Sequence, residues 1–297
     1  MMDATHPDTR QEDKPLKKTP TMLFGHRASD VALFVCVLLF SVCYLLPFIA
    51  MVLSSFKPTA EVISSPPTFL PSEWGLNNYI HMFNNFDFAG SLWNTLVIAL
   101  GSSLFAVSIG SIAGYAVARQ FSKFTKHFFI LALVARIIPP VTLAIPILEM
   151  IRSIGLIDTH LGLMLVHAGI NIPFVIWMTS GFFQDIPKEL EDAAYVDGCN
   201  RLAIYFKVVL PVAAPGIAAT SIFTLMLSWN EFLFALLLTN INAKTAPVGI
   251  SEFLNVYSSE WGAMAAAATL FTVPILILSA LIQRRIVEGM AAGAVKG

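Results

Sequence analysis

Long apolar runs alternate with short polar stretches along most of this chain. Six runs have about 20 or more residues, which is enough to cross a bilayer as a helix. They cover residues 31–54, 90–118, 128–148, 161–183, 213–239 and 261–282. None of them alternates as a barrel strand does, and a helix satisfies its own backbone hydrogen bonds in hydrocarbon. The pattern therefore predicts an all-α integral membrane protein with six transmembrane helices.

The composition supports this class and excludes another. Of 297 residues, 56% are hydrophobic and 12% are charged, whereas soluble domains carry about 25% charged residues. The formal net charge is −1. Nucleic-acid binding needs a clustered basic face, which this chain lacks, so its surroundings are membrane lipid and its partners do not include nucleic acid.

The basic residues predict the orientation. The N-terminal tail, the second and fourth loops and the C-terminal tail together hold 14 of the 18 Lys and Arg residues. By the positive-inside rule both termini and these two loops are cytoplasmic. The predicted parts are a mobile tail, a transmembrane domain whose polar fourth loop covers 184–212, and a second cytoplasmic tail, at residues 1–30, 31–283 and 284–297. No cleavage site follows the first run, so it is expected to remain as an anchor.

The fourth loop has a pattern of its own. Pro187 is placed to begin a helix and Gly198 to end it in a left-handed cap. Small and apolar residues fall at helical spacing between them and predict a narrow face that the cleft of a partner protein can accept. These residues are Leu190, Ala193, Ala194 and Asp197.

A second short helix is expected to follow, from about Asn200 to Val209. Leu210 and Pro211 then break the chain before the fifth span, because proline lacks a backbone N–H. The loop is therefore predicted to be a helix-turn-helix elbow across the cytoplasmic mouth of the bundle, continuous with the fifth span.

At this elbow the chain resembles the inner-membrane permease subunits of binding-protein-dependent ABC importers. Their signature is E-A-A, three further residues and G, followed later by L-P. Here it reads Asp192, Ala193, Ala194, Gly198, Leu210 and Pro211, with Glu191 beside the one departure. The resemblance implies that the elbow is a coupling helix seated in a groove of an ATPase. The implied ATPase-coupling residues are Glu191, Asp192, Ala193, Ala194, Asp197, Gly198, Leu210 and Pro211.

Three further stretches are similar to the carbohydrate-importing, maltose-type branch of this family: WNEF at 229–232, NNYIHMF at 77–83 and the closing GAVKG. That resemblance implies a bacterial inner-membrane subunit paired with a second, different permease, two ATPase subunits that bind ATP and Mg²⁺, and an external sugar-binding protein. The transported solute would be a carbohydrate or sugar derivative. The tail residues Val295, Lys296 and Gly297 would reach into the ATPase dimer.

Charged residues within the spans have two interpretations. Arg136 lies in the third run and Glu231 in the fifth, and in hydrocarbon such groups must face a cavity, a partner or each other. One interpretation is a structural ion pair or a subunit contact. The other is that Arg136, Asn230 and Glu231 line the translocation path, where they bind sugar hydroxyls or, in the case of Arg136, attract an acidic sugar. His167, inside the fourth run, is expected to be a helix-contact residue.

The chain shows no enzymatic motif. It has no G-x-x-x-x-G-K-[ST] loop for ATP and no histidine pair with metal-ligand spacing, so we expect a non-enzyme with no cofactor of its own. The alternatives are an importer permease for amino acids or peptides, and a secondary transporter, which usually has an inverted repeat. The sequence does not specify which sugar, polyol, glycoside or acidic sugar is carried.

Overall fold

The computed structural model describes residues 26–120, 123–254 and 260–294, and does not describe the side chains of 26–29, 123, 126 and 281–294. It divides into two units, residues 1–49 and 50–297, each described here by itself. The first unit contributes only the start of α1, whose described side chains are exposed from Asp30 onward. The described residues contain helices and no strand.

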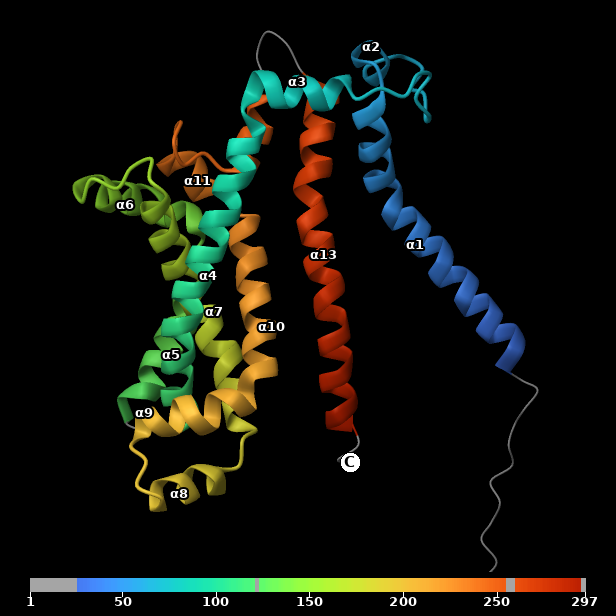
Figure 1. Cartoon of the computed structure of the whole chain (residues 1–297). Coiled ribbons are helices and arrows are strands. Elements are labelled where there is room, and N and C mark those ends of the chain that lie inside the picture. Colours follow the sequence, from blue (N-terminus) through green and yellow to red (C-terminus); the bar gives the residue numbers. More distant parts are fainter. Residues whose placement is uncertain (1–25, 121–122, 255–259, 295–297) are drawn as a thin grey trace, which may run out of the picture. The chain divides into compact units, whose positions relative to one another are not determined.

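The helices are α1 (His26–Phe56), α2 (Thr59–Val62), α3 (Asn77–Phe86), α4 (Phe88–Ala118), α5 (Lys123–Ala135), α6 (Pro140–Ser153), α7 (His160–Gln184), α8 (Lys188–Val196), α9 (Arg201–Ile204), the π turn η1 (Tyr205–Val209), α10 (Leu210–Trp229), α11 (Leu233–Leu238), α12 (Ala246–Glu252) and α13 (Trp261–Ala294) (Figure 1). Five helical segments of the described chain are long and apolar enough to cross a membrane, and the number is six if the bent pair α5 and α6 is counted as one span. The predicted all-α membrane fold is confirmed.

Both terminal boundaries differ from the prediction. α1 begins at His26, five residues inside the predicted N-terminal tail, and α13 continues to Ala294, well into the predicted C-terminal tail. Hydropathy marks where a helix leaves hydrocarbon, whereas helical hydrogen bonding continues until a breaking residue stops it.

The second unit is built on α4, α7 and α10. α4 and α7 share the most extensive contact, and α10 packs against both. Small residues allow the close approach of α4 and α7: a Cβ added to Gly110 would lie 2.7 Å from the Cβ of Val175. Membrane helices have little hydrophobic drive to associate, so van der Waals contact of this kind supplies much of their packing energy.

The third predicted span is not one helix. α5 ends at Ala135, α6 begins at Pro140, and the two axes differ by 99°. The prediction of a continuous span is wrong because Pro139 and Pro140 each lack an N–H, and a proline at the first helical position starts a new helix.

The fifth predicted span is also interrupted, but at a different point. Helical structure is continuous from Arg201 to Trp229, so the predicted break at Leu210 and Pro211 is wrong. The π turn η1 precedes Pro211, and such a turn accommodates a missing backbone donor. In Figure 1 the segment changes direction between α9 and α10, as π turns and prolines allow. The interruption falls instead at residues 230–232, before α11.

Asp158 holds the loop that follows α11. Its carboxylate accepts backbone N–H bonds from Asn240, Ile241, Asn242 and Ala243 at 2.8 to 3.2 Å. Burial raises the pKa of this carboxyl, but the hydrogen bonds from Asn240 and its neighbours outweigh burial and lower the pKa to about 2. The ionised carboxylate of Asp158 therefore stabilises the loop that follows α11.

We expect Gly110→Ala to destabilise the protein by about 1–3 kcal/mol, because the new methyl group collides with Val175, which is fully buried. The melting temperature of the purified protein in detergent measures this. Gly181→Ala on α7 is the matched control, since nothing lies within 4 Å of its added Cβ. Equal melting temperatures for the two variants would contradict close α4–α7 packing at Gly110.

The contribution of Asp158 should depend on pH. An aspartate in an unfolded chain has a pKa of about 3.9, above the folded value, so the stabilisation is complete above about pH 4 and is lost as the pH falls toward 2. We expect the melting temperature to fall more steeply in this range for the unmodified protein than for Asp158→Asn. Glu73→Gln, which alters an exposed carboxylate, is the control. Parallel curves for the unmodified protein and Asp158→Asn would refute this role.

Candidate functional site

The polar loop, at the end of the bundle that carries α8, is anchored to its own chain by an ion pair. Arg119, the residue after α4, places Nε and Nη2 2.5 Å from the Glu191 carboxylate, and the hydroxyl of Tyr115 donates to the same carboxylate at 2.6 Å. Arg119 also donates to the carbonyl of Ile186 at 3.0 Å. The two charged side chains are only 5% and 13% exposed, so the pair is shielded from solvent and its geometry is fixed.

A hydrophobic cluster completes this anchor. Ala194 of α8 packs with Tyr115 of α4, Phe183 of α7 and Tyr205 of η1. The three aromatic rings lie 5.4 to 6.1 Å apart, within the range of favourable ring contacts. α8 is therefore packed against the ends of α4 and α7 and against the segment that leads into α10.

The outward face of α8 differs in one residue from the predicted one. Leu190, Ala193 and Asp197 are exposed, as predicted, but Ala194 is buried. Helical spacing gives the angles between residues and does not say which side meets the rest of the chain. Val196 is 85% exposed, an unusual environment for a large apolar side chain. Gly198 has φ +85°, which confirms the predicted left-handed cap.

A second group of polar residues is buried where α4, α7 and α10 meet. Nδ1 of His167 lies 2.7 Å from the hydroxyl of Ser228, which lies 2.7 Å from the hydroxyl of Ser102. Nε2 of His167 lies 3.0 Å from the carboxylate of Glu231. His167 is 1% exposed, so these contacts replace water. The carboxylate of Glu231 also accepts from the first backbone N–H groups of α11.

Among the described side chains, Glu231 pairs with His167 and not with Arg136. Asn230 is exposed, and its side-chain amide donates to the carbonyl of Met226 in its own helix at 2.8 Å. The sequence missed the partnership of His167, although a histidine inside an apolar run is itself a signal for a polar partner.

Arg136 lies in the interruption between α5 and α6. Its guanidinium sits over the ring of Phe174, 5.3 Å from the centroid. It borders a cavity of about 350 Å³ that reaches α6, α7 and Phe234 of α11. The other lining residues are apolar or glycine. Of the predicted site residues, Val295, Lys296 and Gly297 lie outside the described residues.

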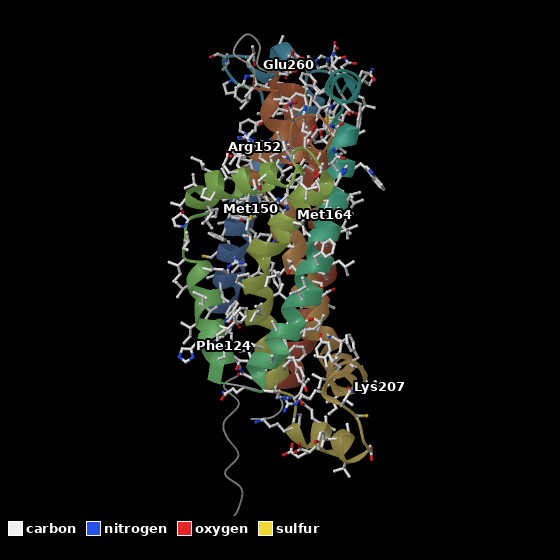
Figure 2. The ribbon with its side chains drawn as sticks, turned by 90° about the vertical axis from the view of Figure 1, so that its left-hand side faces the viewer. Phe124, Met150, Arg152, Met164, Lys207 and Glu260 are labelled. Carbon is white, nitrogen blue, oxygen red and sulfur yellow. The ribbon has the colours of Figure 1, made fainter. Side chains whose placement is uncertain are left out.

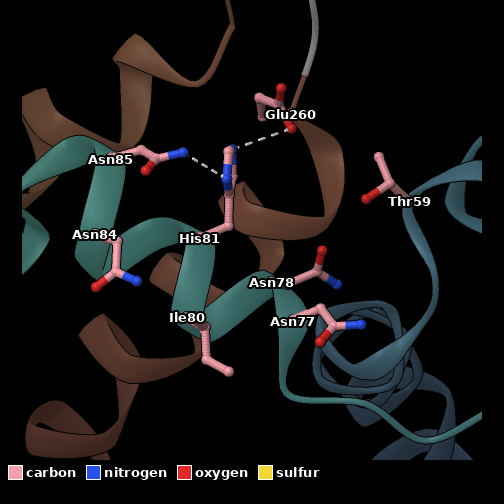
Figure 3. Close-up of a pocket in the computed structure, with 8 residues that line it drawn as sticks. All are labelled: Thr59, Asn77, Asn78, Ile80, His81, Asn84, Asn85 and Glu260. Carbon is pink, nitrogen blue, oxygen red and sulfur yellow. Dashed lines mark hydrogen bonds and ion pairs between the residues drawn. The ribbon is translucent and has the colours of Figure 1, made fainter.

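A second cavity, which is polar, lies beside α3, at the end of the second unit opposite α8. Figure 3 shows His81 between Asn85, 2.7 Å from its Nδ1, and Glu260, 3.6 Å from its Nε2. The pocket has a volume of about 410 Å³. Figure 2 shows Glu260 at this end and Lys207 at the α8 end. The remaining lining residues are Thr59, Asn77, Asn78, Ile80 and Asn84.

Comparisons with known proteins agree with this architecture. The model of the family "Binding-protein-dependent transport system inner membrane component" matches residues 106–291. The trehalose transport system permease protein SugB of Mycobacterium tuberculosis is 37% identical over 256 residues, 85% of this chain and 93% of that protein. The sulfoquinovosyl glycerol transport system permease protein SmoH of Agrobacterium fabrum is 34% identical over 254 residues, 85% and 89% of the two chains.

A solved bacterial ABC transporter involved in the import of the acidic polysaccharide alginate has the same fold as this chain. The TM-score is 0.76 at 22% sequence identity, and the match covers 90% of this chain and 99% of that chain.

The buried contact between His167 and Glu231 should be measurable as a coupling. Because either single change leaves a buried polar partner unsatisfied, we expect His167→Leu and Glu231→Leu each to lower the melting temperature by about 5 to 10 °C. The double variant should lose less than the sum, with a coupling of about 0.5–3 kcal/mol. Ser221→Ala is the control, since that hydroxyl bonds only within α10. Strictly additive losses would show that the two side chains do not interact.

Proposed function

Because the chain belongs to the family of inner-membrane components of binding-protein-dependent transport systems, we propose that it imports a carbohydrate as one permease subunit of an ATP-driven complex. The family match covers more than half of the chain, and the relatives above are matched over most of their length. The chain is accordingly a multi-pass protein of the inner membrane.

The names of the relatives favour a carbohydrate solute. Those reported above are named for trehalose and sulfoquinovosyl glycerol, and the solved neighbour for alginate. Their substrates differ in size and charge, so the family assignment alone supports the class of solute and not its identity. An amino-acid or peptide solute receives no support from these relatives.

The main support for the proposal is that α8 packs against its own chain on one side and is exposed on the other. Its inward side is fixed to α4 and α7 through Glu191 and Ala194, while its outward side presents Ala193 and Val196 without cover from this chain. A helix built in this way passes on a force applied from outside. We assign that force to an ATPase subunit whose groove accepts the outward side.

The proposal also includes the other partners of the complex. The α8 end faces the cytoplasm, where two ATPase subunits bind ATP and Mg²⁺, and this chain itself catalyses no reaction. The α3 end then faces the external solute-binding protein. A second, different permease completes the path, and the C-terminal tail reaches the ATPases. ATP-driven closure of the ATPases would move α8 and α10 together and switch the path between its two openings.

We expect Val196→Asp to lower ATP-dependent uptake by at least about tenfold and to reduce co-purification of the ATPase. A charge on the outward side disfavours contact with a groove, whereas Val196 is 85% exposed and contributes little to the packing of its own chain. Val196→Thr, which nearly keeps the shape, is the matched control and should retain most of the uptake. Uptake and ATPase recovery are measured in the assembled complex.

The melting temperature of the isolated variant separates loss of coupling from loss of folding. It should stay within about 2 °C of the unmodified chain, since exposed substitutions rarely alter stability. If Val196→Asp leaves uptake and ATPase recovery unchanged, α8 is not the coupling element.

A further inference from the structure

We propose that Arg136 is the specificity-determining residue for an anionic group on the transported carbohydrate. The inference rests on the proposed function and narrows the solute to carbohydrates that carry a carboxylate, sulfonate or phosphate. Its evidence is the place of Arg136 in the fold, the absence of a counter-charge in the described chain, and the pocket beside it.

Arg136 lies against the middle of α7, a helix long and apolar enough to cross a membrane. α7 runs from His160 to Gln184, so its central residue is Ile172. Phe174, on which the guanidinium of Arg136 lies, is within one helical turn of that centre. A charged group at this depth is costly unless it faces water, an anion or protein dipoles.

The backbone at Arg136 points to the same conclusion independently. Residues 136–139 are not helical, and all four are exposed. Irregular backbone at membrane depth is tolerated only where it is buried in protein or lines a polar cavity. The described part of this chain leaves the segment exposed. Of the two settings we assign it the polar cavity, which the solute path of an importer provides.

No carboxylate of the described side chains forms an ion pair with Arg136. Glu231, the acidic residue of the fifth span, is held by His167 and by backbone N–H groups of α11. The guanidinium lies over the ring of Phe174, which is a favourable cation–π position. Its N–H donors lie in the plane of the group and remain suited to a bidentate anion.

The pocket beside Arg136 has the size and shape of a small-ligand site. Its volume of about 350 Å³ lies within the usual range of about 300–1,000 Å³. It lies where two interrupted spans meet, because Ile138 and Pro140 come from the first interruption and Phe234 closely follows the second. The pocket has the single charge of Arg136 and otherwise apolar or glycine lining residues. Such a pocket discriminates between ligands by their charge more than by the arrangement of their hydroxyl groups.

A phospholipid headgroup does not fit this position. Headgroups lie at the edge of a hydrocarbon core about 30 Å thick, so a headgroup is about 15 Å from a group at the centre. An anion that reaches Arg136 must therefore travel through the protein. We therefore assign this anion to the transported solute, which the importer carries through the protein.

The test uses the complete transport complex in proteoliposomes and glycoside pairs that differ only in charge, glucosides against the matching glucuronides and 6-sulfonates. We expect the unmodified complex to import charged members. Arg136→Gln should lower kcat/KM for them by about tenfold or more, the order expected for one charge-assisted hydrogen bond. Arg136→Lys should recover part of this loss. Arg152→Gln is the control, because Arg152 is exposed on α6 and pairs with Glu149. Figure 2 shows Arg152 near Met150 of the pocket.

The outcomes separate the two proposals. Import of only neutral glycosides by the unmodified complex, or an equal loss for neutral and charged members in Arg136→Gln, would overturn the role of Arg136 and leave the importer standing. An equal loss is what a contact with a carboxylate of the second permease would give. ATP-dependent import of no carbohydrate, charged or neutral, in a panel that also includes oligosaccharides and polyols would instead overturn the proposed function. The charged-to-neutral ratio is read within each variant, so a lower yield of folded complex does not affect it.

Discussion

The second unit is held together at its centre by the buried hydroxyl of Ser228. This group contacts Ser102 of α4 and His167 of α7, and so joins the three core helices at one point. Because His167 also contacts Glu231, the same network fixes the residue that caps the first N–H groups of α11. The network therefore sets where α10 ends and α11 begins. In hydrocarbon each of these groups would be costly alone, and together they satisfy one another.

The sequence predicted the number and kind of spans, the polar loop and its left-handed turn at Gly198, because each depends on a local property. Apolar runs report burial in lipid, and a glycine at positive φ reports a turn. The interruptions were missed, although Pro139 and Pro140 stand in the sequence. A hydropathy window averages over about 20 residues and is insensitive to two that lack a backbone donor. At Leu210 and Pro211 the error was the opposite one, since a π turn allowed the helix to continue.

The details of the site could not be predicted for a different reason. His167 and Glu231 are separated by 64 residues, and Arg119 and Glu191 by 72, so their meeting depends on how α4, α7 and α10 pack. The loop motif draws attention to Glu191 and Ala194 but does not show that both face their own chain. In each case the residue type indicates that the buried side chain has a partner, but only the packing of the helices shows which residue that partner is.

One helical segment, Arg201–Trp229, connects the anchor of α8 with the centre of the bundle. Tyr205 packs against the anchor of α8, and Ser228 and Trp229 close the same segment near the centre of the bundle. Within this segment Ser228 contacts His167 on α7. The non-helical residues 230–232 come next, and φ and ψ change there at less cost than within a helix. Phe234 follows closely and borders the pocket of Arg136. The interruption in the fifth span thus lies between the helix that starts at the α8 anchor and the pocket of Arg136.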